Sequence, residues 1–262
     1  MARFAYFLSF LLLTVSTTAY ADPSPAAEEP AYVELAGRAP AQVITKCTVP
    51  NTAALTFDDG PYWFMREVIR QLEAANGKAT FFVNGNNWAC IYNTELSGNI
   101  RYAFERGHQV ASHTWAHKDL TTLTWDQIHD EMWRVEQAIT RITGAVPAFM
   151  RPPYGNQNQL VRDASGARNQ TIVLWDVDSG DSTGASVDQQ KATYDAVVAR
   201  RPSTILSLQH EVQWKNVYET LPYVISKLKG AGYKFVTVAD CLGRSKYQRV
   251  GPAEARNANW KC

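Results

Sequence analysis

The sequence predicts an α/β protein built on a parallel sheet. Short β-prone runs alternate along the chain with segments of helical periodicity, and this order repeats from about residue 53 to the C-terminal region. Repeated β-then-α order favours parallel strands joined by right-handed crossovers. The number of units fits a (β/α) barrel, complete or incomplete, or an open doubly wound sheet.

The predicted strands are short runs rich in β-branched and aromatic residues. In chain order they are Ala53–Phe57, Ala79–Val83, Gln109–Ser112, Ala148–Met150, Thr171–Trp175, Ile205–Leu208 and Phe235–Val238.

The predicted helices lie between these strands. Tyr62–Ala75 carries apolar residues at roughly helical spacing, and Thr124–Ile142 opens with Thr124 and Gln127, the spacing of a capping box. Val187–Ala199 and Val217–Lys229 show similar patterns.

The N-terminus has the pattern of a signal peptide over residues 1–21. Arg3 precedes an apolar run, Phe4–Leu13, and the segment ends in Ala19-Tyr20-Ala21, a small-residue cleavage site. The apolar run is too short to span a bilayer, which takes ~20 residues. We therefore expect a secreted protein, either extracellular or in the cell wall.

The rest of the chain divides into three parts. Residues 22–41 are rich in Ala, Pro and Glu and predict a flexible lead-in. Residues 42–245 predict one domain of catalytic size, and residues 246–262 a C-terminal extension. This extension ends in polar residues, so we expect no lipid-anchor signal there.

Composition limits the classes of partner. Of 262 residues, 45% are hydrophobic, which excludes a mostly disordered chain. Lys and Arg number 26 and Asp and Glu 25, so the formal net charge is +1, and removal of residues 1–21 with Arg3 makes it zero. A neutral protein has no long-range attraction for polyanions. We expect no nucleic-acid partner, no membrane contact after signal cleavage, and a monomer.

Export changes the interpretation of the four cysteines. Cys47, Cys90, Cys241 and Cys262 lack CxxC spacing, which argues against a zinc–thiolate site. An even number in an oxidising compartment predicts two disulfides, for which three connectivities exist. Asn169 begins a glycosylation sequon, Asn169-Gln170-Thr171.

Polar side chains collect where the predicted strands end. In parallel α/β folds, functional residues gather at the C-terminal ends of the strands. Carboxylates, histidines and an arginine follow five of them, in Thr56–Pro61, Ser112–His117, Arg151–Gly155, Asp176–Asp181 and Gln209–Glu211. We expect these segments to meet at one rim.

Two of the histidines predict a metal site. His113 and His117 are four residues apart, so both imidazoles can reach one ion, and Asp58-Asp59 lies at a neighbouring strand end. Two histidines and a carboxylate with open positions match catalytic zinc. The same set holds Fe(II) in oxygenases, but that reading leaves Asp58, Arg151 and His210 unexplained.

The remaining rim residues predict hydrolysis. One carboxylate of the Asp58-Asp59 pair can ligate an ion while the other takes a proton. Pro152 and Pro153 have no N–H, so Tyr154 offers the first backbone donor after Arg151 for an oxyanion. His210 is the candidate general acid, with Asp178 as its expected partner. His108 and His129 are interpreted as structural or surface residues.

At this point the sequence resembles a known family. TFDDGP at Thr56–Pro61, HTWAH at His113–His117, RPPYG at Arg151–Gly155, DSGD at Asp178–Asp181 and LSLQH at Leu206–His210 follow the order of the five motifs of polysaccharide deacetylases. In that family, these motifs belong to the NodB-homology domain of carbohydrate esterase family 4. The resemblance covers about Cys47–Leu242, and the segment Thr237–Gly243 resembles the closing strand of fungal chitin deacetylases.

The resemblance implies a fold and a set of roles. The fold would be a distorted or incomplete (β/α) barrel. Asp58 would be the general base, paired with Arg151, and Asp59, His113 and His117 would hold zinc, or cobalt or another divalent ion. Tyr154 would supply the oxyanion N–H, and Asp178 would support His210. Leu208 would line the acetyl pocket.

One position departs from the family pattern. Ser182 stands where the family often has Trp after the second Asp of the fourth motif. Trp214 and Trp175 are the candidate replacements for that pocket wall. The resemblance also implies the disulfide Cys47–Cys241, and with it Cys90–Cys262.

The resemblance implies a secreted, metal-dependent chitin deacetylase that releases acetate from chitin or chitooligosaccharides. Without a separate carbohydrate-binding module, the sequence favours soluble oligomers or accessible chains. The alternatives are a deacetylase of peptidoglycan or acetylxylan with the same residues, and an inactive chitin-binding protein.

Overall fold

The computed structural model describes residue 1 and residues 38–262 of the chain. The predicted signal peptide and most of the predicted lead-in lie outside the described residues. Within them, no helix is both long and apolar enough to cross a membrane.

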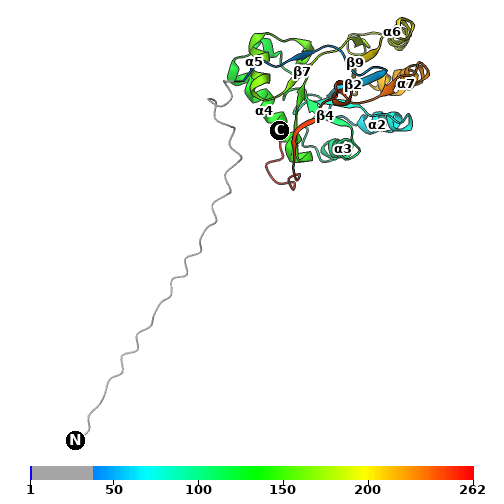
Figure 1. Ribbon diagram of the computed structural model, residues 1–262. Coiled ribbons are helices and arrows are strands. Elements are labelled where there is room, and N and C mark those ends of the chain that lie inside the picture. Colours follow the sequence, from blue (N-terminus) through cyan, green and yellow to red (C-terminus); the bar gives the residue numbers. More distant parts are fainter. Residues whose placement is uncertain (2–37) are drawn as a thin grey trace.

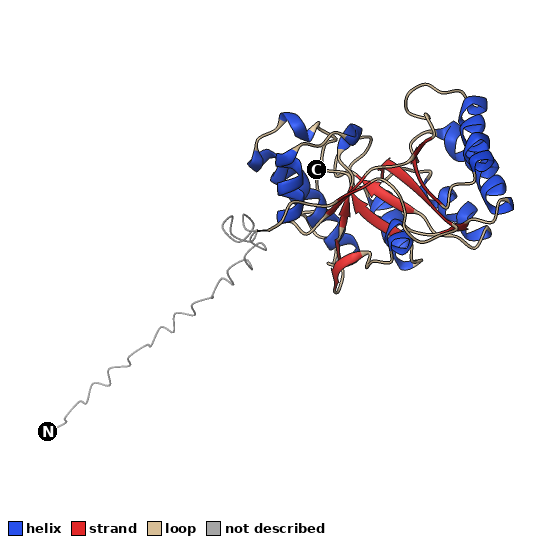
Figure 2. Cartoon of the chain, turned by 45° about the horizontal axis from the view of Figure 1, so that its top comes forward, coloured by secondary structure: helices blue, strands red, loops and turns tan. Residues whose placement is uncertain are grey.

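A curled, parallel sheet of nine strands forms the centre of the molecule (Figure 2). Its order is β1-β7-β6-β4-β3-β2-β9-β8, with β10 pairing with β2 beside this path. Because β1 and β8 are the two ends of that order, the sheet is an incomplete barrel, as the sequence predicted. The strands are β1 Val43–Ile44, β2 Thr52–Gly60, β3 Thr80–Val83, β4 Gln109–Ser112, β6 Phe149–Met150, β7 Thr171–Val173, β8 Val177–Asp178, β9 Thr204–His210 and β10 Lys234–Phe235. An antiparallel pair, β5 Ala145–Pro147 and β11 Tyr247–Val250, forms a second small sheet.

Helices surround the curled sheet (Figure 1). They are α2 Met65–Ala74, α3 Thr94–Glu105, α4 Trp125–Thr143, α5 Gln159–Ala167, α6 Val187–Arg200, α7 Leu221–Gly230 and α8 Val238–Leu242. Short helical turns occur at η1 Leu120–Thr122, η2 Pro153–Gly155 and η3 Asn216–Thr220. The predicted helix over Thr124–Ile142 is α4, and the capping box of Thr124 and Gln127 is present.

The strands alternate between two cores, because successive side chains of a strand point to opposite faces of the sheet. One set packs outward against the helices and includes Phe57, Phe81, Val110 and Ile205. The intervening residues of these strands face the barrel interior, in a cluster that includes Ala54, Phe82, Ala111 and Leu206. This alternation determines which side chains reach the site at the end of the barrel.

The prediction of a strand over Phe235–Val238 is wrong in its second half. Strand β10 ends at Phe235, and helix α8 begins at Val238 because the Thr237 hydroxyl accepts a hydrogen bond from the Asp240 N–H, at 3.2 Å. The helix covers the N-terminal end of the barrel. There the Val238 N–H donates to the Thr80 hydroxyl at 2.9 Å.

Both disulfides form in the pairing that the resemblance implied, Cys47–Cys241 and Cys90–Cys262. The first joins the segment after β1 to α8. The Cys47 carbonyl accepts a hydrogen bond from Thr204, the first residue of β9, so this disulfide lies at the N-terminal end of the strands. The second ties the C-terminus to the loop after β3.

Candidate active site

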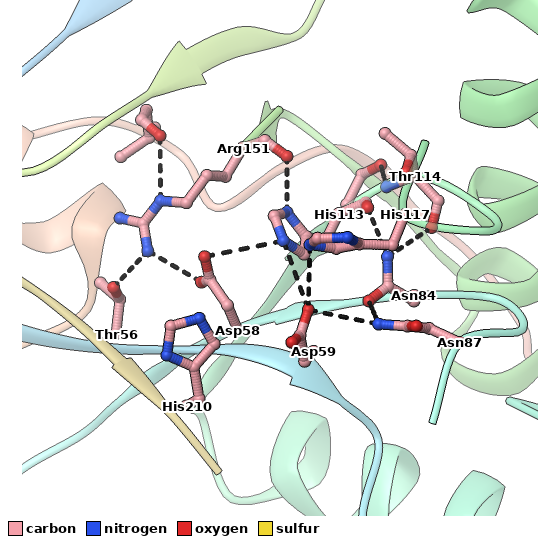
Figure 3. A network of polar contacts seen from close by, with 12 residues as sticks. Thr56, Asp58, Asp59, Asn84, Asn87, His113, Thr114, His117, Arg151 and His210 are labelled. Atoms are coloured by element: carbon pink, nitrogen blue, oxygen red, sulfur yellow. Dashed lines mark hydrogen bonds and ion pairs between the residues drawn. The ribbon is translucent and has the colours of Figure 1, made fainter. Parts of the chain in front are cut away.

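The inward-facing side chains continue into polar residues at the C-terminal ends of the strands. In β2, Ala54 is followed at intervals of two by Thr56 and Asp58, and in β9, Leu206 is followed by Leu208 and His210. The parallel register sets Asp58 beside His210. The same interval leads from interior residues of β4 and β6 to His113 and Arg151. The predicted rim therefore forms, and its side chains face one another (Figure 3).

Asp59, His113 and His117 form a group that can hold a metal ion. Their ligand atoms all lie within 4.8 Å of one another. The Asp59 Oδ1 is 3.6 Å from His113 Nε2 and 3.3 Å from His117 Nε2. One carboxylate and two imidazole nitrogens suit zinc and similar divalent ions.

The surroundings of His113 hold its ring in a form and orientation that can bind a metal ion. Its Nδ1 lies 2.7 Å from the Arg151 carbonyl oxygen, which leaves Nε2 facing Asp59. Burial lowers the pKa of His113 to about 3, although the negative charge of Asp59 offsets part of this effect. A neutral imidazole held through its other nitrogen is the form that binds metal. The residues therefore fit the divalent ion that the sequence predicted.

The backbone around this group is held in left-handed conformations that are uncommon for residues with a side chain. Asp59 has a φ of 70°, Thr114 of 70°, His117 of 53° and Tyr154 of 61°. Such conformations cost about 1–3 kcal/mol each and persist where the surrounding structure determines them. The Asn84 side-chain amide supports this geometry by donating to the carbonyls of His113, at 2.5 Å, and Thr114, at 3.1 Å.

Asp58 lies between the metal-binding group and a buried arginine. Its Oδ1 accepts a hydrogen bond from Arg151 at 2.8 Å, while its Oδ2 lies 3.8 Å from His113 Nε2. The Arg151 side chain is fully buried and also donates to Thr56 and to the carbonyls of Val173 and Leu174. Burial raises the pKa of Asp58, and the charges of Arg151 and His210 partly offset that rise. A carboxylate with one oxygen held and the other free can take a proton.

The prediction that Asp178 supports His210 is wrong. His210 Nδ1 lies 2.8 Å from Asp181 Oδ1, and the His210 N–H donates to Asp181 Oδ2 at 2.7 Å. Asp181 is buried, whereas Asp178 is exposed in edge strand β8 and accepts a hydrogen bond from the Gly180 N–H. The chain turns after β8, and this turn brings the second aspartate of DSGD toward β9.

Asp181 sets the protonation of His210. Burial alone would lower the pKa of His210, but the hydrogen bond and charge of Asp181 outweigh it and raise that pKa to about 9. A protonated imidazole whose Nδ1 is occupied by Asp181 can donate a proton from Nε2.

The other predicted binding residues lie at different depths. Leu208 is buried on the inner face of β9, and Tyr154 is 65% exposed with its ring 4.8 Å from that of His117. Trp175 lies by the site, 5.5 Å from the Arg151 guanidinium and against Gly155. Trp214 instead stacks on Tyr218, and Ser182 is exposed.

Sequence reasoning missed three residues at this rim and assigned no role to a fourth, Glu211, which lies in the predicted rim segment Gln209–Glu211. Asn84, Asn87 and Trp88 follow β3, and Asn87 and Trp88 donate to the Asp59 carboxylate at 3.4 and 3.3 Å. Glu211 follows His210 and is fully buried, with its Oε1 accepting from the Tyr62 N–H at 3.1 Å. Asn84 lies two residues after Phe82 and so continues the inward-facing positions of β3. This spacing could have predicted that Asn84 reaches the rim.

His108, His129 and Asn169 lie away from this group. The His108 ring is buried and accepts a hydrogen bond from the Ala79 N–H, and burial lowers its pKa to about 4. His129 lies 3.1 Å from the Arg168 guanidinium in a buried cluster. Both fit the structural role that was predicted. Asn169 is exposed, so its sequon stays a prediction.

Comparison with known proteins points to one family. The sequence profile of the polysaccharide deacetylases matches residues 45–173. A chitin deacetylase of Pestalotiopsis sp. is 37% identical over 201 residues, covering 77% of this chain and 67% of the relative. The corresponding enzyme of Colletotrichum lindemuthianum is 36% identical over 207 residues, or 76% and 83% of the two chains.

A solved structure and a bacterial relative extend this comparison. The structure of the Colletotrichum lindemuthianum chitin deacetylase superimposes with a TM-score of 0.74 at 32% identity, covering 79% of this chain and 94% of the other. A peptidoglycan-N-acetylglucosamine deacetylase of Listeria monocytogenes is 34% identical over 203 residues. That match covers 76% of this chain and 41% of the relative.

Proposed function

This chain belongs to the polysaccharide deacetylase family, and from that premise we propose that it hydrolyses the N-acetyl groups of N-acetylglucosamine residues in chitin or chitooligosaccharides. The products are acetate and glucosamine units. The observation that carries the proposal is the register of β2 and β9, which sets Asp58 beside His210 at the metal-binding group. The substrate follows from the similarity to the two fungal enzymes.

A base and an acid are both available in this arrangement. Asp58 Oδ2 takes the proton of the attacking water, while Oδ1 stays bonded to Arg151. His210 then gives a proton from Nε2 to the amide nitrogen as the bond to the acetyl carbon breaks, and Asp181 holds its ring. The Tyr154 N–H is the proposed donor to the oxyanion, and Leu208 the proposed wall for the acetyl methyl.

Asp59, His113 and His117 would hold the metal ion, and we propose zinc, with cobalt or another divalent ion as a substitute. Bound there, the ion would polarise the amide carbonyl and lower the pKa of a water molecule.

We also propose that the protein is exported, to the extracellular space or the cell wall, and acts as a monomer. The leader pattern of residues 1–21 and the two disulfides support export. The proposed division keeps a catalytic domain at 42–245 and an extension at 246–262. The Cys90–Cys262 disulfide fixes that extension to the domain.

Acetate release tests this function directly. We expect chitohexaose to yield acetate, a chelator to stop the release, and added zinc to restore it. Replacing the base, Asp58→Asn, should lower kcat by at least ~10²-fold because the amide of asparagine cannot take the proton of the attacking water. Metal analysis of this variant should still find one equivalent of ion. Full activity of Asp58→Asn would exclude Asp58 as the base.

The similarity to the Listeria monocytogenes enzyme supports a second candidate substrate, peptidoglycan. Acetate should therefore be measured in parallel on chitohexaose, peptidoglycan and acetylxylan. The highest kcat/KM on either of the last two would replace chitin as the proposed substrate. Chitin binding without acetate release under any metal would indicate an inactive binding protein.

A further inference from the structure

The exposed aromatic side chains of the described residues all lie at one end of the barrel. Trp63 follows β2, Trp88 follows β3, Tyr154 follows β6, and Trp214 and Tyr218 follow β9. Their exposed fractions range from 41% to 65%. Exposed rings in a soluble protein indicate a binding surface when they cluster.

Five rings on this side form a continuous series of contacts, which we call the aromatic track: Trp88, Tyr62, Phe64, Tyr218 and Trp214. The ring centroids are 6.2 Å apart for Trp88 and Tyr62 and 5.3 Å for Tyr62 and Phe64. They are 5.7 Å apart for Phe64 and Tyr218 and 5.3 Å for Tyr218 and Trp214. The rings come from the segments after β2, β3 and β9, so the fold assembles the track from three separate parts of the chain.

The track is continuous with the proposed active site. The Trp88 indole N–H donates to Asp59 Oδ2 at 3.3 Å, so one end of the track touches the metal-binding group. At Tyr218 the track borders a groove of about 460 Å³ between α2 and α7. A chain whose one unit lies at Asp58 and His210 could therefore continue along these rings.

The charges around the track favour an uncharged ligand. Glu67 and Arg70, which line the groove beside Tyr218, pair with each other at 2.6 Å. Lys215 and Glu219 flank Tyr218 in sequence with opposite charges. A polyanion would need unpaired cations, whereas the C–H faces of sugar rings need apolar aromatic faces.

We propose that the aromatic track binds sugar units of an uncharged glycan beyond the unit being deacetylated, which makes this enzyme selective for chains of several units. This inference rests on the proposed function. It differs from the sequence-based interpretation of Trp214 as part of the acetyl pocket, because Trp214 stacks on Tyr218 while Trp175 lies against Arg151.

The test compares the double variant Trp214→Ala/Tyr218→Ala with Trp214→Phe/Tyr218→Phe, which keeps both rings. The measured quantity is the ratio of kcat/KM on chitohexaose to kcat/KM on chitobiose. We expect this ratio to fall about tenfold in the alanine variant, mainly through KM on chitohexaose, and to stay within about twofold in the phenylalanine variant. Trp214→Ala alone is the second variant, since its half-exposed side chain can be removed with little effect on folding.

A binding measurement separates the two proposals. In an Asp58→Asn background, calorimetry should show weaker chitohexaose binding when the two rings become alanines. An unchanged ratio together with unchanged affinity would overturn the aromatic track while leaving the deacetylase function intact. If the unaltered enzyme released acetate from neither saccharide, the proposed function would fail, and the calorimetric comparison would still decide whether the rings bind the glycan.

Discussion

The proposed chemistry depends on two histidines that the fold holds in opposite protonation states. Burial lowers the pKa of His113 to about 3, whereas Asp181 raises the pKa of His210 to about 9 against the effect of burial. Asp58 neighbours both rings: its Oδ2 lies 3.8 Å from His113 Nε2, and the strand register sets it beside His210. Differences of this kind between neighbouring groups are how one site obtains both functions at one pH.

Replacing Asp181 should remove the acid at neutral and alkaline pH. In Asp181→Asn the pKa of His210 loses its main raising cause, so the alkaline limb of kcat/KM should move to lower pH, with a loss of ~10²-fold or more at pH 8. A histidine with a raised pKa stabilises the fold fully below the unfolded value, about 6.5, and the contribution fades as pH rises through about 9. Asp178→Asn is the matched control and should keep its pH profile. If only Asp178→Asn altered the pH profile of kcat/KM, Asp178 rather than Asp181 would be the partner of His210.

Glu211 should make the stability of the protein decrease with pH. Its carboxyl is fully buried, its Oε2 has no hydrogen-bond partner among the described residues, and burial raises its pKa well above the usual value. Above the unfolded pKa, about 4.5, the folded state holds a proton that the unfolded state releases, so folding becomes less favourable as pH rises.

Glu211→Gln should remove this dependence. The stability of Glu211→Gln relative to the unaltered protein should increase from pH 5 to pH 8, by up to about 1.4 kcal/mol per pH unit. The measurement is urea unfolding of both metal-free proteins at each pH, and a difference that does not vary with pH would contradict the prediction.

At the scale of elements, segments with a clear period could be predicted, whereas helix α3 and the two shortest edge strands were missed. The helix over Thr124–Ile142 was predicted within one residue at each end, because capping and periodicity agree there. Strands β1 and β8 have two residues each, so pairing with neighbours rather than local pattern defines them. Helix α3 was missed although Asn93 caps it by accepting from the N–H groups of Glu95 and Leu96.

The site was more predictable than the elements around it, for a physical reason. Alternation along the strands carries Asp58 and His210 to the same inner rim, and both follow strands that were predicted from sequence. The turn after β8 obeys no such period. Sequence alone could therefore not distinguish Asp178 from Asp181 as the partner of His210.

The disulfide Cys90–Cys262 should stabilise the loop that supports the metal-binding group. The loop carries Asn87 and Trp88, which contact Asp59, and the buried Trp260 of the C-terminal segment lies with its ring 5.6 Å from that of Tyr92 in this loop. Cys90→Ser/Cys262→Ser should lower the free energy of unfolding by roughly 2–4 kcal/mol and weaken zinc binding severalfold. Urea unfolding and a zinc titration measure the two effects.

The matched control removes the other disulfide. Cys47→Ser/Cys241→Ser should also lower stability, but it should leave zinc affinity unchanged where the protein remains folded, since this pair lies at the opposite end of the barrel. Equal losses of zinc affinity in both variants would show that the effect is one of general stability.

At the scale of the whole molecule, the balance of charge matches the substrate that we propose. The chain has 26 basic and 25 acidic residues, and the aromatic track adds apolar faces beside Glu67 and Arg70, which pair with each other. Binding to a neutral glycan then depends on ring contacts and hydrogen bonds, and no counterions are released from the ligand.

The activity should consequently be insensitive to salt. Between 50 and 200 mM sodium chloride, kcat/KM on chitohexaose should change by less than about twofold, whereas a protein with six to ten phosphate contacts loses roughly 10³–10⁵ in affinity over that range. Initial rates at fixed pH and metal concentration measure this. Chitohexaose partly deacetylated beforehand is a useful comparison, because it presents cationic amines to the same surface. A steep linear fall of log kcat/KM with log salt on the fully acetylated substrate would show that bulk charge does contribute to binding, and would contradict a neutral, ring-based recognition of the chain.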